Sequence, residues 1–115
     1  MNHQKGNKKL NKPTDQRIAL LRSLTLALFE NQKIKTTDVR AKAAKSYAEK
    51  IITLGKNGDL SSIRKALKML PNKSAVKKIF SFSRKYADRH GGYIRLTKVG
   101  FRKGDAAPVS LLELA

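Results

Sequence analysis

The sequence predicts an α+β fold, with three to four helices packed on a small mixed sheet of about three strands and a basic extended N-terminal arm. Apolar residues recur at helical spacing through residues 14–83, and from residue 93 the pattern changes to the alternation of strands. Residues 1–13 are rich in lysine and asparagine and leave almost nothing to bury. Helices followed by strands favour one helical layer on a sheet.

The first helix is expected to begin at Thr14, whose side chain favours the N-cap position, and to end near Asn31. Its apolar side chains recur every three or four residues, which predicts one buried face. The predicted inward positions are Ile18, Leu21, Leu24 or Thr25, and Leu28, with Leu20 and Phe29 widening the stripe. The β-branched segment that follows, residues 32–36 around Ile34, is predicted as an edge strand.

The second helix is expected to follow Thr37 as its cap, with Asp38 at its first position. Its predicted inward residues are Ala44, Tyr47 or Ala48, Ile51 and Leu54, and residues 56–58 end it. Asp59 is the expected cap of the third helix and Pro71 ends that helix. The predicted buried side of the third helix comprises Leu60, Ile63, Leu67 and Leu70.

A fourth helix is expected after Asn72, which is a suitable cap. Its predicted inward residues are Val76, Ile79, Phe80 and Ser83. Residues 93–99 and 109–114 then alternate as strands, separated by a glycine-bounded basic loop at residues 100–105. We expect these two strands to pair antiparallel, with the segment around Ile34 as a candidate third strand.

The domain organisation follows from length and composition. A chain of 115 residues fits one domain. Because Lys and Arg outnumber Asp and Glu by 26 to 8, we expect residues 14–115 to form a single α+β RNA-binding domain. Residues 1–13 are expected to form a basic arm that is disordered when free. The alternative for the arm is a solubilising terminus without a binding role.

The charge points to a polyanionic partner. The chain has 26 Lys and Arg against 8 Asp and Glu, which gives a formal net charge of +18. Repulsion among these like charges would destabilise a compact monomer. Nucleic acid supplies a dense array of phosphates. An anionic membrane surface is the competing polyanion, but the basic residues are spread along the whole chain, which disfavours one membrane-surface helix. The apolar stretch Ile18–Phe29 is interrupted by Arg22 and is too short to cross a membrane.

The residues that catalysis would need show no recognisable pattern. The chain has no cysteine, and His3 and His90 lie far apart without a metal-binding context. Asp15, Asp38 and Asp59 fall at predicted helix N-termini, where they complement the helix dipole and cap free amides. We therefore expect no enzyme activity, no cofactor, no metal and no small-molecule substrate.

The strongest local cluster of basic residues runs from Arg84 to Lys103 and is interleaved with aromatic residues and glycines. Basic side chains supply phosphate contacts, and aromatic rings can stack on bases. For Tyr93 and Phe101 a core position is the alternative to stacking. Two alternatives for the whole chain stay open: a DNA-binding regulator with a helix-turn-helix at residues 38–70, and a small enzyme acting on nucleic acid.

Several motifs resemble the bacterial-type large-subunit ribosomal protein seventeen family. The opening of the chain matches in His3, Lys9-Leu10-Asn11 and Thr14-Asp15-Gln16-Arg17. Inner matches are Ile34-Lys35-Thr36-Thr37 and Ile52-Thr53-Leu54. The most specific matches are Gly91-Gly92-Tyr93-Ile94-Arg95, the run Phe101-Arg102-Lys103-Gly104-Asp105-Ala106-Ala107-Pro108, and Leu112-Glu113-Leu114. The resemblance covers essentially the whole chain.

The resemblance implies a structural constituent of the large ribosomal subunit, ribosome-bound in the cytoplasm or in an organelle. Its partners would be large-subunit ribosomal RNA and neighbouring ribosomal proteins near the peptide exit side, and it would support subunit assembly. The positions that match the family's RNA-facing pattern are His3, Lys5, Lys8, Lys9, Arg17, Lys35, Arg95 and Arg102. Charge and position add the candidates Lys12, Arg22, Arg40, Arg89, His90, Tyr93, Lys98 and Lys103. Asn2 and Gln4 stand where the family usually has basic residues, which lowers the charge at the tip of the arm.

Overall fold

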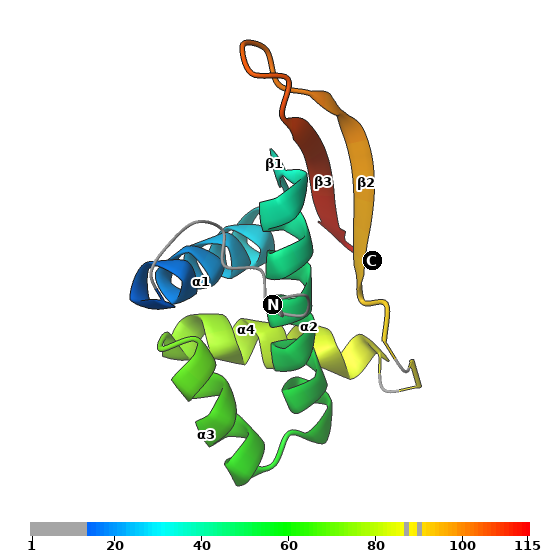
Figure 1. The fold of residues 1–115 in the computed structure, drawn as a ribbon. Coiled ribbons are helices and arrows are strands. Elements are labelled where there is room, and N and C mark those ends of the chain that lie inside the picture. Colours follow the sequence, from blue (N-terminus) through cyan, green and yellow to red (C-terminus); the bar gives the residue numbers. More distant parts are fainter. Residues whose placement is uncertain (1–13, 87, 90) are drawn as a thin grey trace, which may run out of the picture.

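The structure is a computed structural model that describes residues 14–86, 88–89 and 91–115. In chain order its elements are α1 (Thr14–Asn31), β1 (Lys33–Thr37), α2 (Asp38–Asn57), α3 (Leu60–Met69), α4 (Lys73–Ser83), the 3-10 turn η2 (Arg84–Tyr86), β2 (Ile94–Phe101) and β3 (Pro108–Leu114). Figure 1 shows the helices gathered on one side of a narrow sheet. The predicted α+β fold class, with helices packed on a small sheet, is therefore confirmed.

The sheet has the strand order β1-β3-β2, so the last strand of the chain lies in the middle. Both pairings are antiparallel, which confirms the predicted pairing of the two long strands and includes the short strand around Ile34. The expectation of a mixed sheet is wrong. Each neighbour of β3 runs against it, and the closing hairpin between β2 and β3 needs only a short connection.

Helix α2 is the centre of the fold. It packs on the other three helices and on all three strands, and Figure 1 shows it running between the sheet and the helical layer. Its buried residues include Ala41, Ala44, Ala48, Ile51 and Ile52. Small alanines on one face let neighbouring backbones approach closely, and the isoleucines fill the space between the sheet and α4.

Most predicted helix faces are confirmed. Thr25 is the inward residue of α1 at the position where Leu24 was the alternative, and Leu28 and Phe29 are buried beside it. The hydroxyl of Thr25 is satisfied within its own helix, because it donates to the carbonyl of Leu21 at 2.8 Å. In α4 the buried residues include Val76, Ile79 and Ser83, as expected.

The predicted buried face of α3 needs a correction. Leu60 is 61% exposed, and the fully inward positions of this helix are Ser62 and Ala66, followed by Leu70. Leu60 is the first residue of the helix, so its side chain lies at the free end and not over the core. The four-residue spacing of two small residues places α3 close against its neighbours, with Ile63 and Leu67 at the margin of the contact.

Two of the predicted caps are confirmed by their hydrogen bonds. The carboxylate of Asp59 accepts from the amide of Ser62 at 2.8 Å, and the amide oxygen of Asn72 accepts from the amide of Ala75 at 3.0 Å. Thr37 does occupy the N-cap position of α2, but its side chain makes no capping hydrogen bond. Thr37 is also the last residue of β1, so strand geometry governs its conformation.

Asp38 has a different task from the predicted capping of free amides. Its carboxylate accepts a hydrogen bond from the hydroxyl of Ser110 at 2.7 Å and pairs with Lys42 at 3.1 Å. The hydrogen bond from Ser110 ties the start of α2 to the middle strand of the sheet. The hydrogen bond from Ser110, together with the one from Lys42, lowers the pKa of Asp38 below its ordinary value.

Candidate nucleic-acid interface

Among the described residues, helices pack against one face of the sheet, and the opposite face is open (Figure 1). We call this the outer sheet face. Because side chains alternate along a strand and cross-strand partners share a face, the register defines its members. They are Lys33, Lys35 and Thr37 of β1, Val109, Leu111 and Glu113 of β3, and Arg95 and Thr97 of β2.

The outer sheet face combines cations with a partly apolar middle. Lys33 and Arg95 flank Glu113 from opposite sides, and both are exposed. Lys35 is exposed beside Leu111, which is half-buried in the middle strand. Basic side chains at the edges of such a surface can contact phosphate groups, and its apolar middle can contact a planar group of the same ligand.

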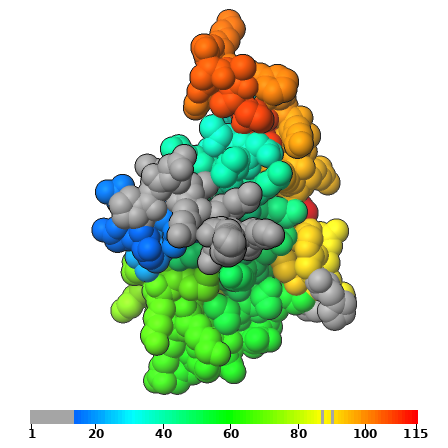
Figure 2. All heavy atoms as spheres, viewed as in Figure 1, coloured from blue at the N-terminus to red at the C-terminus, as the bar shows by residue number. Residues whose placement is uncertain are grey.

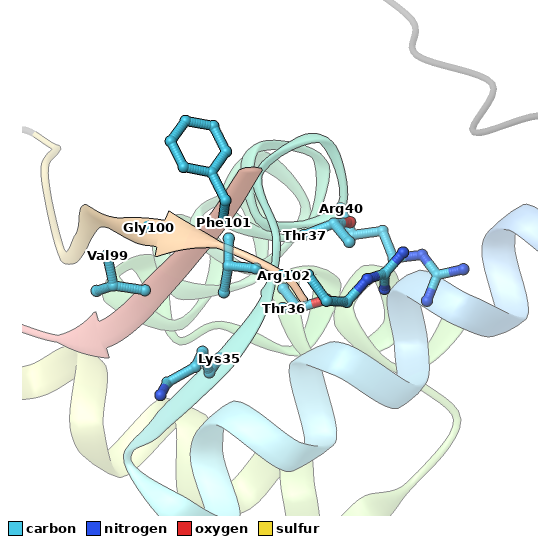
Figure 3. Close-up of a pocket in the computed structure, with 9 residues that line it drawn as sticks. Lys35, Thr36, Thr37, Arg40, Val99, Gly100, Phe101 and Arg102 are labelled. Carbon is cyan, nitrogen blue, oxygen red and sulfur yellow. The ribbon is translucent and has the colours of Figure 1, made fainter. Parts of the chain in front are cut away.

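A hollow of about 480 Å³ lies where this face meets the hairpin between β2 and β3. Its lining is Lys35, Thr36, Thr37, Arg40, Val99, Gly100, Phe101, Arg102 and Val109. Figure 3 shows the side chains of Arg40 and Arg102 extending to the same side, whereas the ring of Phe101 points away from them. Three cations from separate parts of the chain, Lys35, Arg40 and Arg102, thus line one hollow.

The hairpin beside the hollow departs from the predicted loop. Strand β2 runs two residues further than expected, through Gly100 and Phe101, and a bulge between Lys98 and Gly100 shifts its register against β3. A bulge adds one unpaired residue and re-aims the strand beyond it. Gly100 has a φ of 141°, a conformation that side-chain-bearing residues rarely adopt, which explains glycine at this bend.

The tip of the hairpin is closed by an ion pair. Arg102 donates to Asp105 through both Nε, at 3.1 Å, and Nη2, at 2.5 Å. The carboxylate also accepts from the amide of Ala107 at 3.2 Å. The hydrogen bonds from Arg102 hold the pKa of Asp105 at about 2. Part of the guanidinium group of Arg102, predicted as an RNA contact, therefore serves to order the loop.

The strongest local cluster predicted from the sequence is divided in the structure. Arg89 lies before β2 and Lys103 lies after it, and β2 spans eight residues, which is about 26 Å at 3.3 Å per residue. Lys98 faces the helix side, because it pairs with Ser110 and its charge lowers the pKa of Asp38. Basic residues that are near in sequence thus lie at opposite ends and on both faces of one strand.

The alternatives for the two aromatic residues are resolved by their exposure. Tyr93 is 2% exposed, and its hydroxyl accepts from Lys56 at 2.8 Å and donates to the carbonyl of Arg89 at 2.9 Å. Tyr93 is therefore a core residue and not an RNA contact, because neither face of its ring is open to a base. Phe101 is the opposite case and is 75% exposed.

Two of the predicted RNA contacts, Arg22 and Arg89, donate hydrogen bonds to backbone carbonyls within the fold. Arg22 donates through Nε to the carbonyl of Met69 and through Nη2 to that of Lys68, both at 2.9 Å, which satisfies the C-terminal end of α3. Arg89 donates to the carbonyl of Gly92 at 3.4 Å and lies over the ring of Tyr86. Because these arginines already have partners within the protein, their side chains are less available to RNA than those of Lys35 and Arg95, which are exposed.

Several predicted RNA contacts lie outside the described residues. They are His3, Lys5, Lys8, Lys9, Lys12 and His90. Arg17 is half-buried in the first turns of α1. Lys33, which was not among the predicted contacts, joins the outer sheet face. The alternation of Lys33, Ile34 and Lys35 was the available signal, since it places both lysines on one face of a strand.

Neither a metal cluster nor a membrane-spanning helix occurs in the part of the chain that the structure describes. No group of three or more histidine or acidic side chains is placed there to hold a metal ion. None of the helices in this part of the chain combines the length and the apolar character needed to cross a membrane.

The fold and this surface define a class: a small basic α+β protein that presents cations on an open sheet face. The sequence model of ribosomal protein L17 matches residues 20–115. The chain therefore belongs to the ribosomal protein L17 family, a family of structural ribosomal proteins and not of enzymes. This agrees with the resemblance described for its motifs.

Similar proteins come from several bacteria, and each is named large ribosomal subunit protein bL17. The chain is 50% identical to the protein of Clostridium tetani over 95% of its own length and 97% of that protein. It is 49% identical to the protein of Pelobacter propionicus, over 99% and 91% of the two chains. It is 44% identical to the protein of Myxococcus xanthus, over 99% and 83%.

Proposed function

We propose that this chain is a structural component of the large ribosomal subunit that binds ribosomal RNA through the outer sheet face, the adjoining hollow and the basic N-terminal arm. One observation supports the location of the interface most directly. Lys33, Lys35 and Arg95 share an open sheet face, and Arg40 and Arg102 line the hollow at its end. Such a surface positions phosphates, and base contacts add specificity.

The proposal also accounts for the charge. With 26 basic and 8 acidic residues, the compact chain carries internal repulsion that a polyanionic partner would relieve. Two ion pairs are formed within the described residues, Lys42 with Asp38 and Arg102 with Asp105. Phosphates of RNA would neutralise the remaining cations, and the release of condensed counterions would drive binding. Membership of a ribosomal family favours RNA over DNA or a membrane surface as that polyanion.

The interface is tested by removing charge from the outer sheet face. In a Lys35→Gln/Arg95→Gln variant we expect weaker binding to deproteinised large-subunit ribosomal RNA. We also expect the salt dependence of the binding constant to become shallower, by about one unit of slope for each phosphate that the protein no longer neutralises. Filter binding across a salt series measures both quantities.

The matched control is Lys65→Gln/Lys68→Gln, which removes the same charge from exposed positions on α3. Helix α3 lies at the end of the molecule away from the hairpin (Figure 1). We expect this control to bind more tightly than the sheet variant. Equal losses of affinity in the two variants would contradict a localised interface and leave only general attraction between opposite charges.

The arm is proposed to order on the RNA. Deleting residues 1–12 should leave the unfolding transition of the domain unchanged and weaken RNA association. Circular dichroism and filter binding on the same preparations separate the two effects. Unchanged association would contradict a binding role for the arm and favour a solubilising terminus.

The location on the ribosome is proposed from the family resemblance, which implies a position near the peptide exit side beside other ribosomal proteins, and a role in subunit assembly in the cytoplasm. Sucrose-gradient fractionation of tagged protein from its native cells, in low and high salt, is the test. Co-migration with large subunits in both conditions supports integral membership. Release as free protein, or migration with DNA, contradicts it.

A further inference from the structure

The side chain of Phe101 is unusual among the apolar residues of this protein. It is 75% exposed, the highest fraction among the large hydrophobic residues that the structure describes, and Leu60 follows at 61%. Figures 1 and 2 show that the hairpin around it projects beyond the rest of the molecule. A phenyl ring held in water forgoes the stabilisation that burial gives. A partner outside the chain would gain this stabilisation by covering the ring.

The backbone around this ring is ordered. Phe101 is paired with Pro108 at the end of the sheet. Immediately beyond, the amide of Arg102 donates to the carbonyl of Ala107 at 2.8 Å, and the amide of Ala106 donates back to the carbonyl of Arg102 at 3.0 Å. The ion pair between Arg102 and Asp105 closes the same loop. The ring is therefore presented from a fixed position, which lowers the entropy lost on binding.

The chemistry around the ring defines its ligand. The hollow beside it is lined by the cations Lys35, Arg40 and Arg102 and by the apolar side chains of Val99 and Val109. Asp105, the nearby acid, is already engaged by Arg102. The volume of the hollow, about 480 Å³, falls in the range of small-molecule sites. A ligand with a flat apolar face next to a negative charge would contact both the phenyl ring and the cations. A nucleotide unit of RNA has this composition.

We propose that Phe101 is a base-stacking residue: an unpaired base of RNA stacks on its ring, and the adjoining phosphates lie in the hollow against Lys35 and Arg40. This inference rests on the proposed RNA-binding function and specifies one subsite within it. A protein partner fits less well, because lysine is depleted at the centres of protein interfaces and Lys35 and Arg40 would be covered without an acid in the lining of the hollow. Unstacked bases held on aromatic side chains are common in single-stranded RNA recognition.

The protein contains no tryptophan, which allows a direct test. A Phe101→Trp variant carries a single tryptophan at the proposed stacking position, and Leu60→Trp carries one at another exposed apolar position. Deproteinised bacterial large-subunit ribosomal RNA is the probe. We expect RNA to quench the fluorescence of the Phe101→Trp protein and to leave that of the Leu60→Trp protein nearly unchanged, because stacking on a base quenches indole emission.

Affinity gives an independent readout. Base stacking on an aromatic side chain is worth enough that alanine substitution lowers affinity by about 5- to 150-fold. We expect Phe101→Ala to show such a loss with an unchanged salt slope, Phe101→Tyr to bind nearly as the parent does, and Leu60→Ala to bind normally. Circular dichroism of each variant verifies that the domain remains folded.

The outcomes separate the two proposals. If the parent protein binds the RNA but Phe101→Ala binds equally well and Phe101→Trp is not quenched, base stacking is wrong and the proposed function stands. A weaker affinity accompanied by a shallower salt slope also overturns stacking, because it shows that fewer phosphates are neutralised. If Phe101→Ala binds RNA normally but no longer joins large subunits, the ring contacts a protein and the stacking proposal is overturned. Absence of RNA binding by the parent protein contradicts the proposed function and the stacking with it.

Discussion

Three aspartates have their ionised form favoured by specific hydrogen bonds. Asp38 accepts from the hydroxyl of Ser110, and Asp59 accepts from Ser62 at the start of α3. In each case the hydrogen bonds lower the pKa of the carboxyl group. Asp105 shows the largest effect, with its pKa held at about 2 by Arg102. In a chain with so few acids, these carboxylates are used to fix local structure.

These depressed pKa values predict a loss of stability in acid. Since each folded-state pKa lies below the unfolded value of about 3.9, the carboxylates favour the folded state fully above about pH 4. This contribution is lost as the pH falls through the folded-state values, down to about 2 for Asp105. We expect the urea midpoint of unfolding to fall steadily over this window, as measured by circular dichroism.

The Asp105→Asn variant provides the comparison for the lowest part of that window. Asparagine keeps the size of the side chain but has no proton to gain, so the pH dependence contributed by the hairpin should vanish in this variant. The dependence from Asp38 and Asp59 should remain. A midpoint that rises on acidification would contradict the assignment of these carboxylates to the folded state.

The packing of α2 on α4 depends on a glycine in the last turn of α2. A Cβ added at Gly55 would lie 2.9 Å from the Cβ of Ser83 and 3.0 Å from Cδ1 of Phe80. Ser83 has no room to move, because it is fully buried and its hydroxyl donates to the carbonyl of Ile79 at 2.8 Å. The two helices are therefore held at a separation that only glycine permits.

We predict that Gly55→Ala destabilises the protein despite the better helix propensity of alanine. Propensity favours alanine by about 1 kcal/mol, whereas overpacking a close helix contact costs about 1–3 kcal/mol. The steric conflict should outweigh the gain in propensity, for a net loss of up to about 2 kcal/mol in the free energy of unfolding. Urea denaturation measures it.

A double-mutant cycle identifies the cause of this destabilisation. Combining Gly55→Ala with Ser83→Gly opens the space that the new methyl group needs, so the two changes together should cost less than the sum of the single changes. Strict additivity would show that the cost of Gly55→Ala arises elsewhere than at the contact with Ser83.

Charge is the dominant property of the whole molecule. A net charge of +18 on a chain of 115 residues makes the compact state repel itself when the partner is absent. We predict that the melting temperature of the free protein rises as salt increases from about 0.01 to 0.1 M, because the Debye length then falls from about 30 to 10 Å. Differential scanning calorimetry measures the change.

The Lys65→Gln/Lys68→Gln variant, which lowers the net charge without touching the outer sheet face, should depend less on salt. RNA binding should fall over the same range of ionic strength in which the free fold becomes more stable. A melting temperature that falls with salt would show that attractive ion pairs outweigh repulsion in the free protein.

Local sequence signals determined the elements of this fold. Asp59 and Asn72 mark helix starts because a cap depends on amides three residues away. The change from helical spacing to alternation near residue 93 marks the start of the hairpin. Caps and periodicities alike depend on residues that are near neighbours in the chain. The composition indicated a polyanionic partner, since net charge does not depend on how the chain folds.

Tertiary structure alone decided which of these residues reach the surface together. Tyr93 is buried and its hydroxyl accepts a hydrogen bond from Lys56, 37 positions away, and Arg22 donates to a carbonyl 47 positions away. Strand pairing placed Lys35 and Arg95 on one face and divided Arg89 from Lys103. Exposure and proximity in space are set by contacts between distant parts of the chain, and a periodic pattern read along the sequence contains no record of those contacts.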